Sequence, residues 1–281
     1  MDILSLQGLT KRYPAFTLDH AGFTVRQGEI MGLIGRNGAG KSTTLKCLTG
    51  FVHPDEGDIR FFGMPLAGHE REIRQRVAFM SGGVDHYTRK KLRAITAVTR
   101  SFYEERWDEA AYQRYMRLFS LDENKTPATL SAGMRVKYSL TLAMSRRAEL
   151  LILDEPTSGL DPISRDDLTD VFLQLQREGV SILFSTHITA DLDKCADRNT
   201  YIHQGRVMVS QELKAFTEQY CLVEWEDDVP EAFRPLMIGL KQAKRGCTAL
   251  VRAEDAQRLP VPVLRPDLDA IMVHMEKEND Q

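Results

Sequence analysis

A glycine-rich run that contains one lysine is the part of this sequence with the most specific chemistry. It fits the pattern G-x-x-x-x-G-K-[ST] in full, with the residues Gly35, Arg36, Asn37, Gly38, Ala39, Gly40, Lys41, Ser42 and Thr43. Glycines let the backbone curl so that successive N–H groups point at phosphate oxygens. Lys41 is expected to reach the β- and γ-phosphates, and Ser42 to offer its hydroxyl to Mg²⁺. The run therefore predicts a nucleotide-binding P-loop.

The segments on either side of this run have the types that a P-loop requires. Residues 30–34 form a short apolar run typical of a buried strand. After the lysine, Leu45 and Leu48 lie on one side of a predicted helix, and Gly50 is its stop signal. This order of strand, glycine loop and helix is the structural context that a P-loop requires.

Two neighbouring carboxylates follow a second apolar run. Residues 150–153 are all aliphatic and are followed directly by Asp154 and Glu155. Parallel sheets bind ligands at the carboxyl ends of their strands, so both acids are expected beside the phosphates. Asp154 is predicted to hold Mg²⁺, largely through water, and Glu155 to orient and polarise the attacking water.

Further motifs agree with these two in type and order. Leu130 to Met134 precede the paired acids, Ser158 to Asp161 follow them, and His187 comes after a third apolar run. With these motifs the chain resembles the ATP-binding subunit of an ABC transporter over roughly residues 1–210, and most of all the bacterial ABC-2-type exporter ATPases. The resemblance makes residues 130–134 the counterpart of the signature sequence LSGGQ and residues 158–161 the counterpart of the D-loop.

The resemblance implies roles for several single residues. In that family the signature serine and second glycine of one subunit contact the γ-phosphate that the P-loop of the other subunit holds. The matching positions are Ser131 and Gly133, with Ala132 and Met134 beside them. His187 is the expected switch histidine, Asp161 the D-loop aspartate, and Tyr13 the aromatic ring under adenine. ATP is thus expected to join two copies, or this chain and a homologous ATPase subunit, in a two-fold dimer.

The sequence departs from the family pattern in two places. Residues 77–80 lead into Ser81, Gly82 and Gly83, where the family has a glutamine that contacts Mg²⁺ and the membrane subunit. Ser81, a water molecule, or Asp85 from a shifted position could replace that contact. The signature also has alanine for its first glycine and methionine for its glutamine. Because both expected phosphate contacts are kept, we expect a subunit that hydrolyses ATP.

The composition of the chain indicates which classes of partner can be expected. The chain has 281 residues, 27% of them charged, with a formal net charge of -3, so no nucleic acid partner is expected. Its four cysteines show no C-x-x-C spacing, which argues against a zinc site. The first residues do not read as a signal peptide, and no apolar run is long enough to cross a membrane. We therefore expect a separate transmembrane permease that docks on residues 88–120 and holds this chain at the cytoplasmic face of the membrane.

The order of apolar segments predicts an α/β fold. A mostly parallel sheet with helices on its faces is expected to form the P-loop NTPase core, with an antiparallel β sheet at its edge and a helical insert over about 88–147. We predict an ATPase domain over residues 1–215. A shift in composition near Thr217 predicts a small α+β domain over residues 216–281.

These observations favour the ATP-hydrolysing motor of an exporter, with ATP and Mg²⁺ as cofactors. The tail around Arg265 to Met272 is similar to that of many bacterial exporter ATPases, and it favours export together with the missing glutamine. Two alternatives stay open. An importer ATPase would share every motif up to His187, and an ABC ATPase acting on nucleic acid or ribosomes would need no permease.

Overall fold

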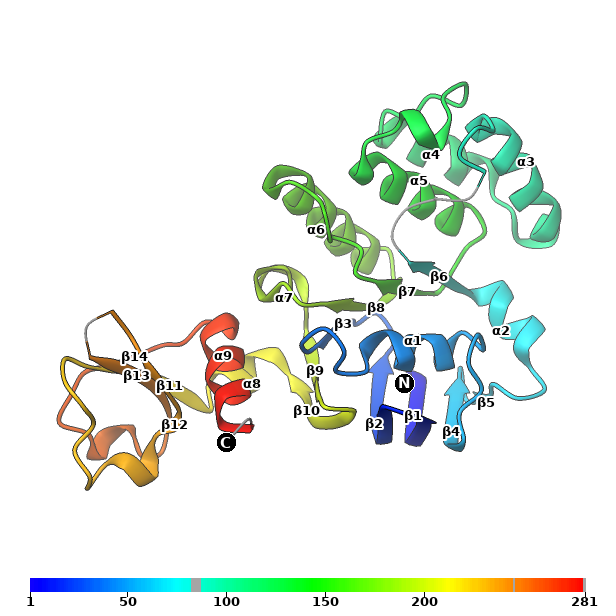
Figure 1. The fold of residues 1–281 in the computed structure, drawn as a ribbon. Helices are drawn as coiled ribbons and strands as arrows, with labels where there is room; N and C mark the ends of the chain where they lie inside the picture. Colours follow the sequence, from blue (N-terminus) through cyan, green and yellow to red (C-terminus); the bar gives the residue numbers. More distant parts are fainter. Residues whose placement is uncertain (82–86, 245, 280–281) are drawn as a thin grey trace. The chain divides into compact units, whose positions relative to one another are not determined.

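The computed structural model describes residues 1–81, 87–244 and 246–279 (Figure 1). The chain forms two compact units. The first contains Met1–His187 and Asn199–Ser210, and the second contains Ile188–Arg198 and Gln211–Gln281. Each unit is described by itself.

A six-stranded sheet is the centre of the first unit. Its strand order is β10-β9-β3-β8-β7-β6, and the pairs β3·β8, β8·β7 and β7·β6 are parallel. The strands are β3 (Ile30–Ile34), β6 (Val77–Ser81), β7 (Leu150–Asp154), β8 (Ser181–Thr186), β9 (Arg198–His203) and β10 (Arg206–Glu212). Strands β3 and β8 are buried along their whole length, as apolar strands covered on both faces must be.

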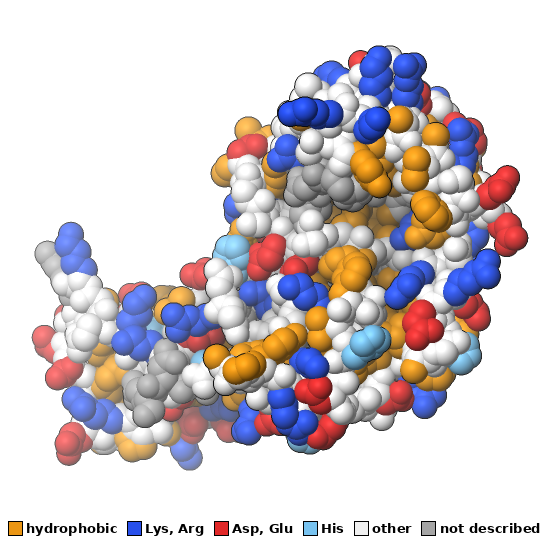
Figure 2. Space-filling view, turned by 45° about the vertical axis from the view of Figure 1, so that its right-hand side comes forward, with side chains coloured by type: hydrophobic (Ala, Val, Ile, Leu, Met, Phe, Trp, Pro, Cys, Tyr) orange, Lys and Arg blue, Asp and Glu red, His pale blue; other side chains and the backbone are white. Residues whose placement is uncertain are grey.

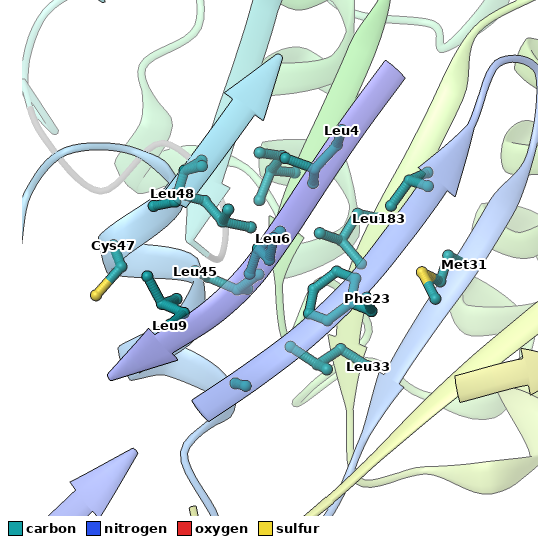
Figure 3. Close-up of a cluster of buried hydrophobic side chains, with 14 of the residues drawn as sticks. Leu4, Leu6, Leu9, Phe23, Met31, Leu33, Leu45, Cys47, Leu48 and Leu183 are labelled. Carbon is teal, nitrogen blue, oxygen red and sulfur yellow. The ribbon is translucent and has the colours of Figure 1, made fainter. Parts of the chain in front are cut away.

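An antiparallel sheet forms a second layer of this unit. Its order is β2-β1-β4-β5, with β1 (Asp2–Tyr13), β2 (Phe16–Arg26), β4 (Glu56–Phe61) and β5 (Met64–Pro65). Helix α1 (Lys41–Leu48) contributes to the core that the two sheets share. Figure 3 shows its Leu45 and Leu48 beside Leu4, Leu6 and Leu9 of β1, with Phe23, Met31, Leu33 and Leu183 in the same cluster. This burial fixes α1, and with it the loop that precedes α1.

A group of helices with its own core lies between β6 and β7 in the sequence. It contains α3 (Leu92–Phe102), α4 (Glu109–Leu118) and α5 (Ala132–Ser145). Their core consists of Leu92, Ile95, Tyr112, Met116, Leu130 and Tyr138. The Thr96 hydroxyl hydrogen-bonds both tyrosine hydroxyls, Tyr112 at 3.1 Å and Tyr138 at 2.8 Å, so the buried polar groups of this core have partners.

Two more helices complete the first unit. Helix α2 (Glu70–Arg76) precedes β6, and α6 (Pro162–Arg177) connects β7 to β8. The Asp161 carboxylate caps α6, Pro162 occupies its first position, and Gly179 follows with a φ of 89°. These are the start and stop signals that the sequence of this helix contains.

The second unit is a small α+β unit. Its four-stranded sheet has the order β12-β13-β11-β14, with β11 (Tyr220–Trp225), β12 (Ile238–Gln242), β13 (Cys247–Arg252) and β14 (Val263–Leu264). Helices α7 (Thr189–Cys195), α8 (Leu213–Thr217) and α9 (Leu268–Asn279) belong to it, and α9 packs on β12 and on α7. Buried Val223, Trp225 and Val251 belong to its core.

The predicted fold class is confirmed. The structure has the mostly parallel sheet, the antiparallel sheet, the helical insert and the α+β unit at the end of the chain. Residues 188–198 belong to the second compact unit, whereas the sequence predicted a single boundary between residues 215 and 216. That boundary stays a prediction. The predicted docking segment, residues 88–120, is not one long helix, because α3 and α4 are separated by a short turn at Glu104–Arg106.

Candidate functional site

The glycine-rich run connects the end of β3 to the start of α1. Its last glycine, Gly40, is the residue before the helix and has a φ of 117°, a conformation that favours glycine. A Cβ at Gly40 would come within 3.0 Å of the Phe16 ring. Gly35 is restricted differently, since a Cβ there would lie 2.2 Å from the carbonyl oxygen of Ile202. These two glycines let the loop curl closely against its neighbours.

Lys41 is buried, and its ammonium group is held by oxygen atoms. Its Nζ donates to the carbonyl oxygens of Gly35 at 2.7 Å and Arg36 at 3.3 Å. Glu155 Oε1 lies 3.4 Å from the same nitrogen. A buried ammonium requires such partners, and incoming phosphate oxygens could replace them.

The carboxylate of Asp154 lies at the carboxyl end of β7, where it meets two hydroxyl groups. Ser42 Oγ on α1 donates to Asp154 Oδ1 at 3.2 Å, and Ser185 Oγ on β8 donates to the same oxygen at 2.6 Å. Hydroxyl and carboxylate oxygens are ligands that Mg²⁺ accepts, together with water and substrate phosphates. The donor set of Ser42 and Asp154 therefore fits the cation that the sequence predicted.

Glu155 and His187 form a hydrogen-bonded pair beside this group. His187 Nδ1 lies 2.8 Å from Glu155 Oε2, while the other carboxylate oxygen of Glu155 faces Lys41. Glu155 has a φ of 50°, an uncommon conformation for a residue other than glycine. Its backbone turn directs the side chain away from the strand and toward the glycine-rich loop.

Lys41, Ser42, Glu155 and His187 line one cleft of about 580 Å³, and Asp154 contacts it through Ser42. The cleft is lined by Ala15, Phe16, Arg36, Asn37, Gly38, Gly40, Lys41, Ser42, Thr43, Glu155, Ser158 and His187. The lining contains the loop backbone, a cation, a hydroxyl and a carboxylate. A cleft with these groups can bind a phosphate chain and present a carboxylate to its outer end.

The signature residues form the start of helix α5. Ser131 is the capping residue, and its hydroxyl accepts a hydrogen bond from the N–H of Met134 at 3.2 Å. Ser131 is exposed, and Ala132, Gly133 and Met134 are partly exposed. A helix start of this kind presents backbone N–H groups and a partial positive charge. Val136, Leu140, Ala143 and Met144 form the buried face of this helix.

Asp161 lies close to this helix start. A Cβ at Gly133 would be 3.7 Å from the hydroxyl of Ser164, and that hydroxyl donates to Asp161 Oδ2 at 2.6 Å. This hydrogen bond, with the N–H groups of Ile163 and Ser164, holds the pKa of Asp161 below its usual range. The signature and the D-loop are therefore two parts of one surface.

The structure thus brings the predicted residues together in two groups. Lys41, Ser42, Asp154, Glu155 and His187 meet at the cleft. Residues 131–134 and Asp161 form the other group, and in the described part of the chain the cleft lining contains none of them. Tyr13 is 41% exposed at the end of β1, where Phe16 is its cross-strand partner and lines the cleft.

The corner with the missing glutamine is partly described. Ser81, the last residue of β6, pairs in register with Asp154 on β7 and is exposed. It therefore lies next to the predicted metal ligand. Asp85, the other candidate for this contact, lies outside the described residues.

Sequence reasoning missed two residues of this site. Ser185 directly follows the apolar residues 182–184, and a serine at the carboxyl end of a buried strand is a recognisable signal of a polar contact. Phe16 is the first residue of β2. The hairpin pairing of Phe16 with Tyr13 is the signal that could have found it.

Comparison with known proteins shows the family of this chain. Residues 18–158 match a protein family described as ABC transporter. A Nod factor export ATP-binding protein I of Burkholderia lata is 36% identical, with 76% of this chain and 70% of the relative covered. The bacitracin transport ATP-binding protein BcrA of Bacillus licheniformis is 31% identical over 73% of this chain and 68% of its own. The structure of an ATP-binding subunit of an ABC transporter superposes with a TM-score of 0.69 at 32% identity, covering 77% of this chain and 92% of its own.

The fold and the cleft define a P-loop nucleotide-binding protein. The chain belongs to the ABC transporter ATP-binding family, whose members bind and hydrolyse ATP to drive transport. No helix in the described residues combines the length and the apolar character needed to cross a membrane.

Proposed function

We propose that this chain is the ATP-hydrolysing motor of an exporter, working as an ATP-dependent dimer on a separate permease. The observation that carries the proposal is the division of the predicted residues into two groups. The cleft holds the phosphate-binding and carboxylate groups, and the start of α5 offers N–H groups elsewhere. A second copy, or a homologous subunit, that brings its α5 to this cleft would complete the site on both sides of a two-fold axis.

The predicted site residues have separate roles in this proposal. Lys41 and the loop N–H groups bind the β- and γ-phosphates, and Glu155 orients and polarises the attacking water, held by His187. Mg²⁺ supplies charge neutralisation on the phosphates when bound, and Ser42 and Asp154 would hold it. Tyr13 supports the adenine ring. In the partner copy, Ser131 and Gly133 contact the γ-phosphate.

Export is supported by the names of relatives. Two relatives more than 30% identical to this chain over most of its length are named for bacitracin transport and for Nod factor export. The proposal places the chain at the cytoplasmic face of the membrane, held there by the permease.

A groove in the first unit is the proposed place for the permease. The groove measures about 820 Å³ and is lined by Gly50, His53, Pro54, Gly57, Asp58, Ile59, Leu66, Ala67, Glu70, Arg71, Arg74, Gln75, Phe102 and Tyr103. Phe102 is 72% exposed, and the neighbouring Phe51 is 73% exposed. Figure 2 shows apolar side chains gathered around the hollow on this face. Exposed phenylalanine side chains at and next to a mixed polar and apolar groove support a protein partner.

One buried arginine connects this groove with the signature helix. Arg146 follows α5 directly, and its guanidinium donates to the carbonyl oxygens of Arg74 at 3.0 Å and Val77 at 2.7 Å. The same group stacks on the ring of Tyr103, a groove residue, at 4.2 Å. Burial holds the pKa of Arg146 below its usual range. Movement of a partner in the groove can therefore reach the helix that carries Ser131.

The docking proposal is tested by co-purification. The Glu155→Gln variant, expressed with its chromosomal neighbours, is extracted in detergent with ATP and compared with the same variant carrying Phe102→Asp. We expect a multi-spanning membrane protein to co-purify with the Glu155→Gln variant. At least about tenfold less of this protein should co-purify when Phe102→Asp is added. Met208→Asp is the control, because Met208 on β10 is also an exposed apolar residue, at 46%, and lies outside both the groove and residues 88–120. A ribosomal or DNA-bound partner would contradict the transport proposal.

A further inference from the structure

Ser185 contacts both carboxylate residues of the site. It lies at the carboxyl end of β8 and pairs in register with Asp154 on the parallel strand β7. Its side chain is completely buried, at 0% exposure. The hydroxyl donates to Asp154 Oδ1 at 2.6 Å and accepts a hydrogen bond from the backbone N–H of Glu155 at 2.9 Å. One buried hydroxyl therefore holds the side chain of the first acid and the backbone of the second.

We propose that Ser185 is a positioning residue for ATP hydrolysis. It acts through Asp154 and Glu155 and does not touch the nucleotide. The inference rests on the roles proposed above for these two acids. It adds the group that fixes their relative geometry, whereas Ile182, Leu183 and Phe184, which precede Ser185 on β8, have no polar side-chain atoms.

The backbone of Glu155 shows why such an anchor is needed. A φ of 50° costs free energy for a residue with a side chain, and it persists only when the surroundings hold it. The N–H of Glu155 is shared between the hydroxyl of Ser185 at 2.9 Å and its carbonyl oxygen at 3.2 Å. Without the hydroxyl, the backbone is free to relax and to move the carboxylate away from His187.

The contact with Asp154 has a second consequence. Asp154 Oδ1 accepts from both Ser185 and Ser42, so this oxygen has a fixed direction and the second carboxylate oxygen is left for the metal and its water. Rotation of this carboxylate would move the ligand that Mg²⁺ requires at a set distance. Loss of the Ser185 hydroxyl is therefore expected to change the Mg²⁺ dependence as well as the rate.

The test compares three variants of the full chain in ATPase assays. Ser185→Ala removes the hydroxyl, and Ser185→Thr keeps it. Ser181→Ala is the matched control, because Ser181 lies on the same strand, is also at 0% exposure, and also accepts from a backbone N–H, that of Gly28 at 2.9 Å. Turnover, KM for ATP and the Mg²⁺ concentration for half-maximal rate are measured, together with melting temperature.

We expect Ser185→Ala to lower kcat roughly 10- to 100-fold, since a displacement of about 1 Å costs a rate of that order. KM for ATP should change little, because Lys41 and the loop bind the phosphates, and the Mg²⁺ requirement should rise. Ser185→Thr should recover most of kcat. Ser181→Ala should keep wild-type kcat and Mg²⁺ dependence at a melting temperature similar to that of Ser185→Ala.

Three outcomes would overturn the inference in distinguishable ways. If Ser185→Ala keeps wild-type kcat and Mg²⁺ dependence while Glu155→Gln is inactive, Ser185 has no positioning role. The proposed function would remain intact in that case. An equal loss of kcat in Ser181→Ala would assign the effect to general destabilisation of β8. An active Glu155→Gln would instead remove the role of Glu155 on which the inference rests.

Discussion

The carboxyl edge of the parallel sheet and the start of helix α5 differ in how completely they are assembled. At the sheet edge, Asp154, Glu155 and His187 already have hydrogen-bond partners within the same chain, and Lys41 is buried beside them. At α5, the capping Ser131 is exposed, and its hydroxyl accepts a hydrogen bond from the N–H of Met134 in the first turn of the same helix.

This difference indicates which half of the site depends on another molecule. A preorganised group can bind nucleotide in a single subunit, because its geometry is fixed before the ligand arrives. An exposed helix start binds phosphate only when another molecule brings its bound phosphate to the N–H groups of the helix. Binding and hydrolysis should therefore be separable by mutation. The predictions below address that separation.

The largest effect is expected from Lys41→Ala. It removes the buried cation of the sheet edge, and a charge-assisted hydrogen bond to phosphate contributes about 1.5–3 kcal/mol, so ATP affinity should fall roughly 10- to 150-fold. Lys46→Ala is the control, since Lys46 is an exposed lysine on the same helix. Isothermal titration calorimetry with ATP measures both. Unchanged affinity in Lys41→Ala would contradict the P-loop assignment.

A variant of the signature residue Ser131 should separate ATP binding from ATP hydrolysis most clearly. Ser131→Arg is expected to leave ATP affinity of the single subunit unchanged, and to lower hydrolysis about tenfold or more because the N–H groups of α5 no longer reach phosphate. Equilibrium binding and ATPase assays on the same preparation test this. A parallel loss of affinity would place the signature in the cis binding site instead.

Mixing the two variants extends the test. A mixed dimer of Lys41→Ala and Ser131→Arg contains one composite site with both halves intact, so the mixture should hydrolyse ATP faster than either variant alone. ATPase activity is followed as the ratio of the two chains is varied at constant total protein. Strictly additive rates at every ratio would contradict the shared site.

The smallest effect is expected from Tyr13→Ala. Stacking on a base contributes about 1–3 kcal/mol, so ATP affinity should fall about fivefold or more. Tyr13→Phe keeps the ring and should bind as the wild type does. Competition between ATP and GTP for the purified chain measures the change. If Phe16, which lines the cleft, carries the base instead, Tyr13→Ala will bind ATP normally.

The sequence predicted the sheet edge well, because its residues follow apolar runs with fixed spacing. Residues 150–153 and 182–184 define two buried strands, and parallel strands end at one edge, which brings Asp154, Glu155 and His187 together. The contacts of Ser185 depend on the register between β7 and β8. Neither run specifies that register by itself, because both are apolar throughout.

The groove and the later unit were less predictable for a related reason. Phe102 and Tyr103 come from the end of α3, whereas Arg71 and Arg74 come from α2, and only the packing of these helices places them around one hollow. In the later unit, His274 on α9 lies 2.6 Å from the carbonyl oxygen of Gly239 on β12. Long-range contacts of this kind have no local pattern in the sequence.

The most direct test of the account is the oligomeric state of Glu155→Gln with and without ATP and Mg²⁺. Hydrolysis is expected to stop in this variant while binding continues, so ATP should hold two copies together. Sedimentation velocity of the purified chain should show a monomer without nucleotide and a dimer at saturating ATP. A monomer at saturating ATP, in a sample that calorimetry shows to be fully loaded, would contradict the composite site.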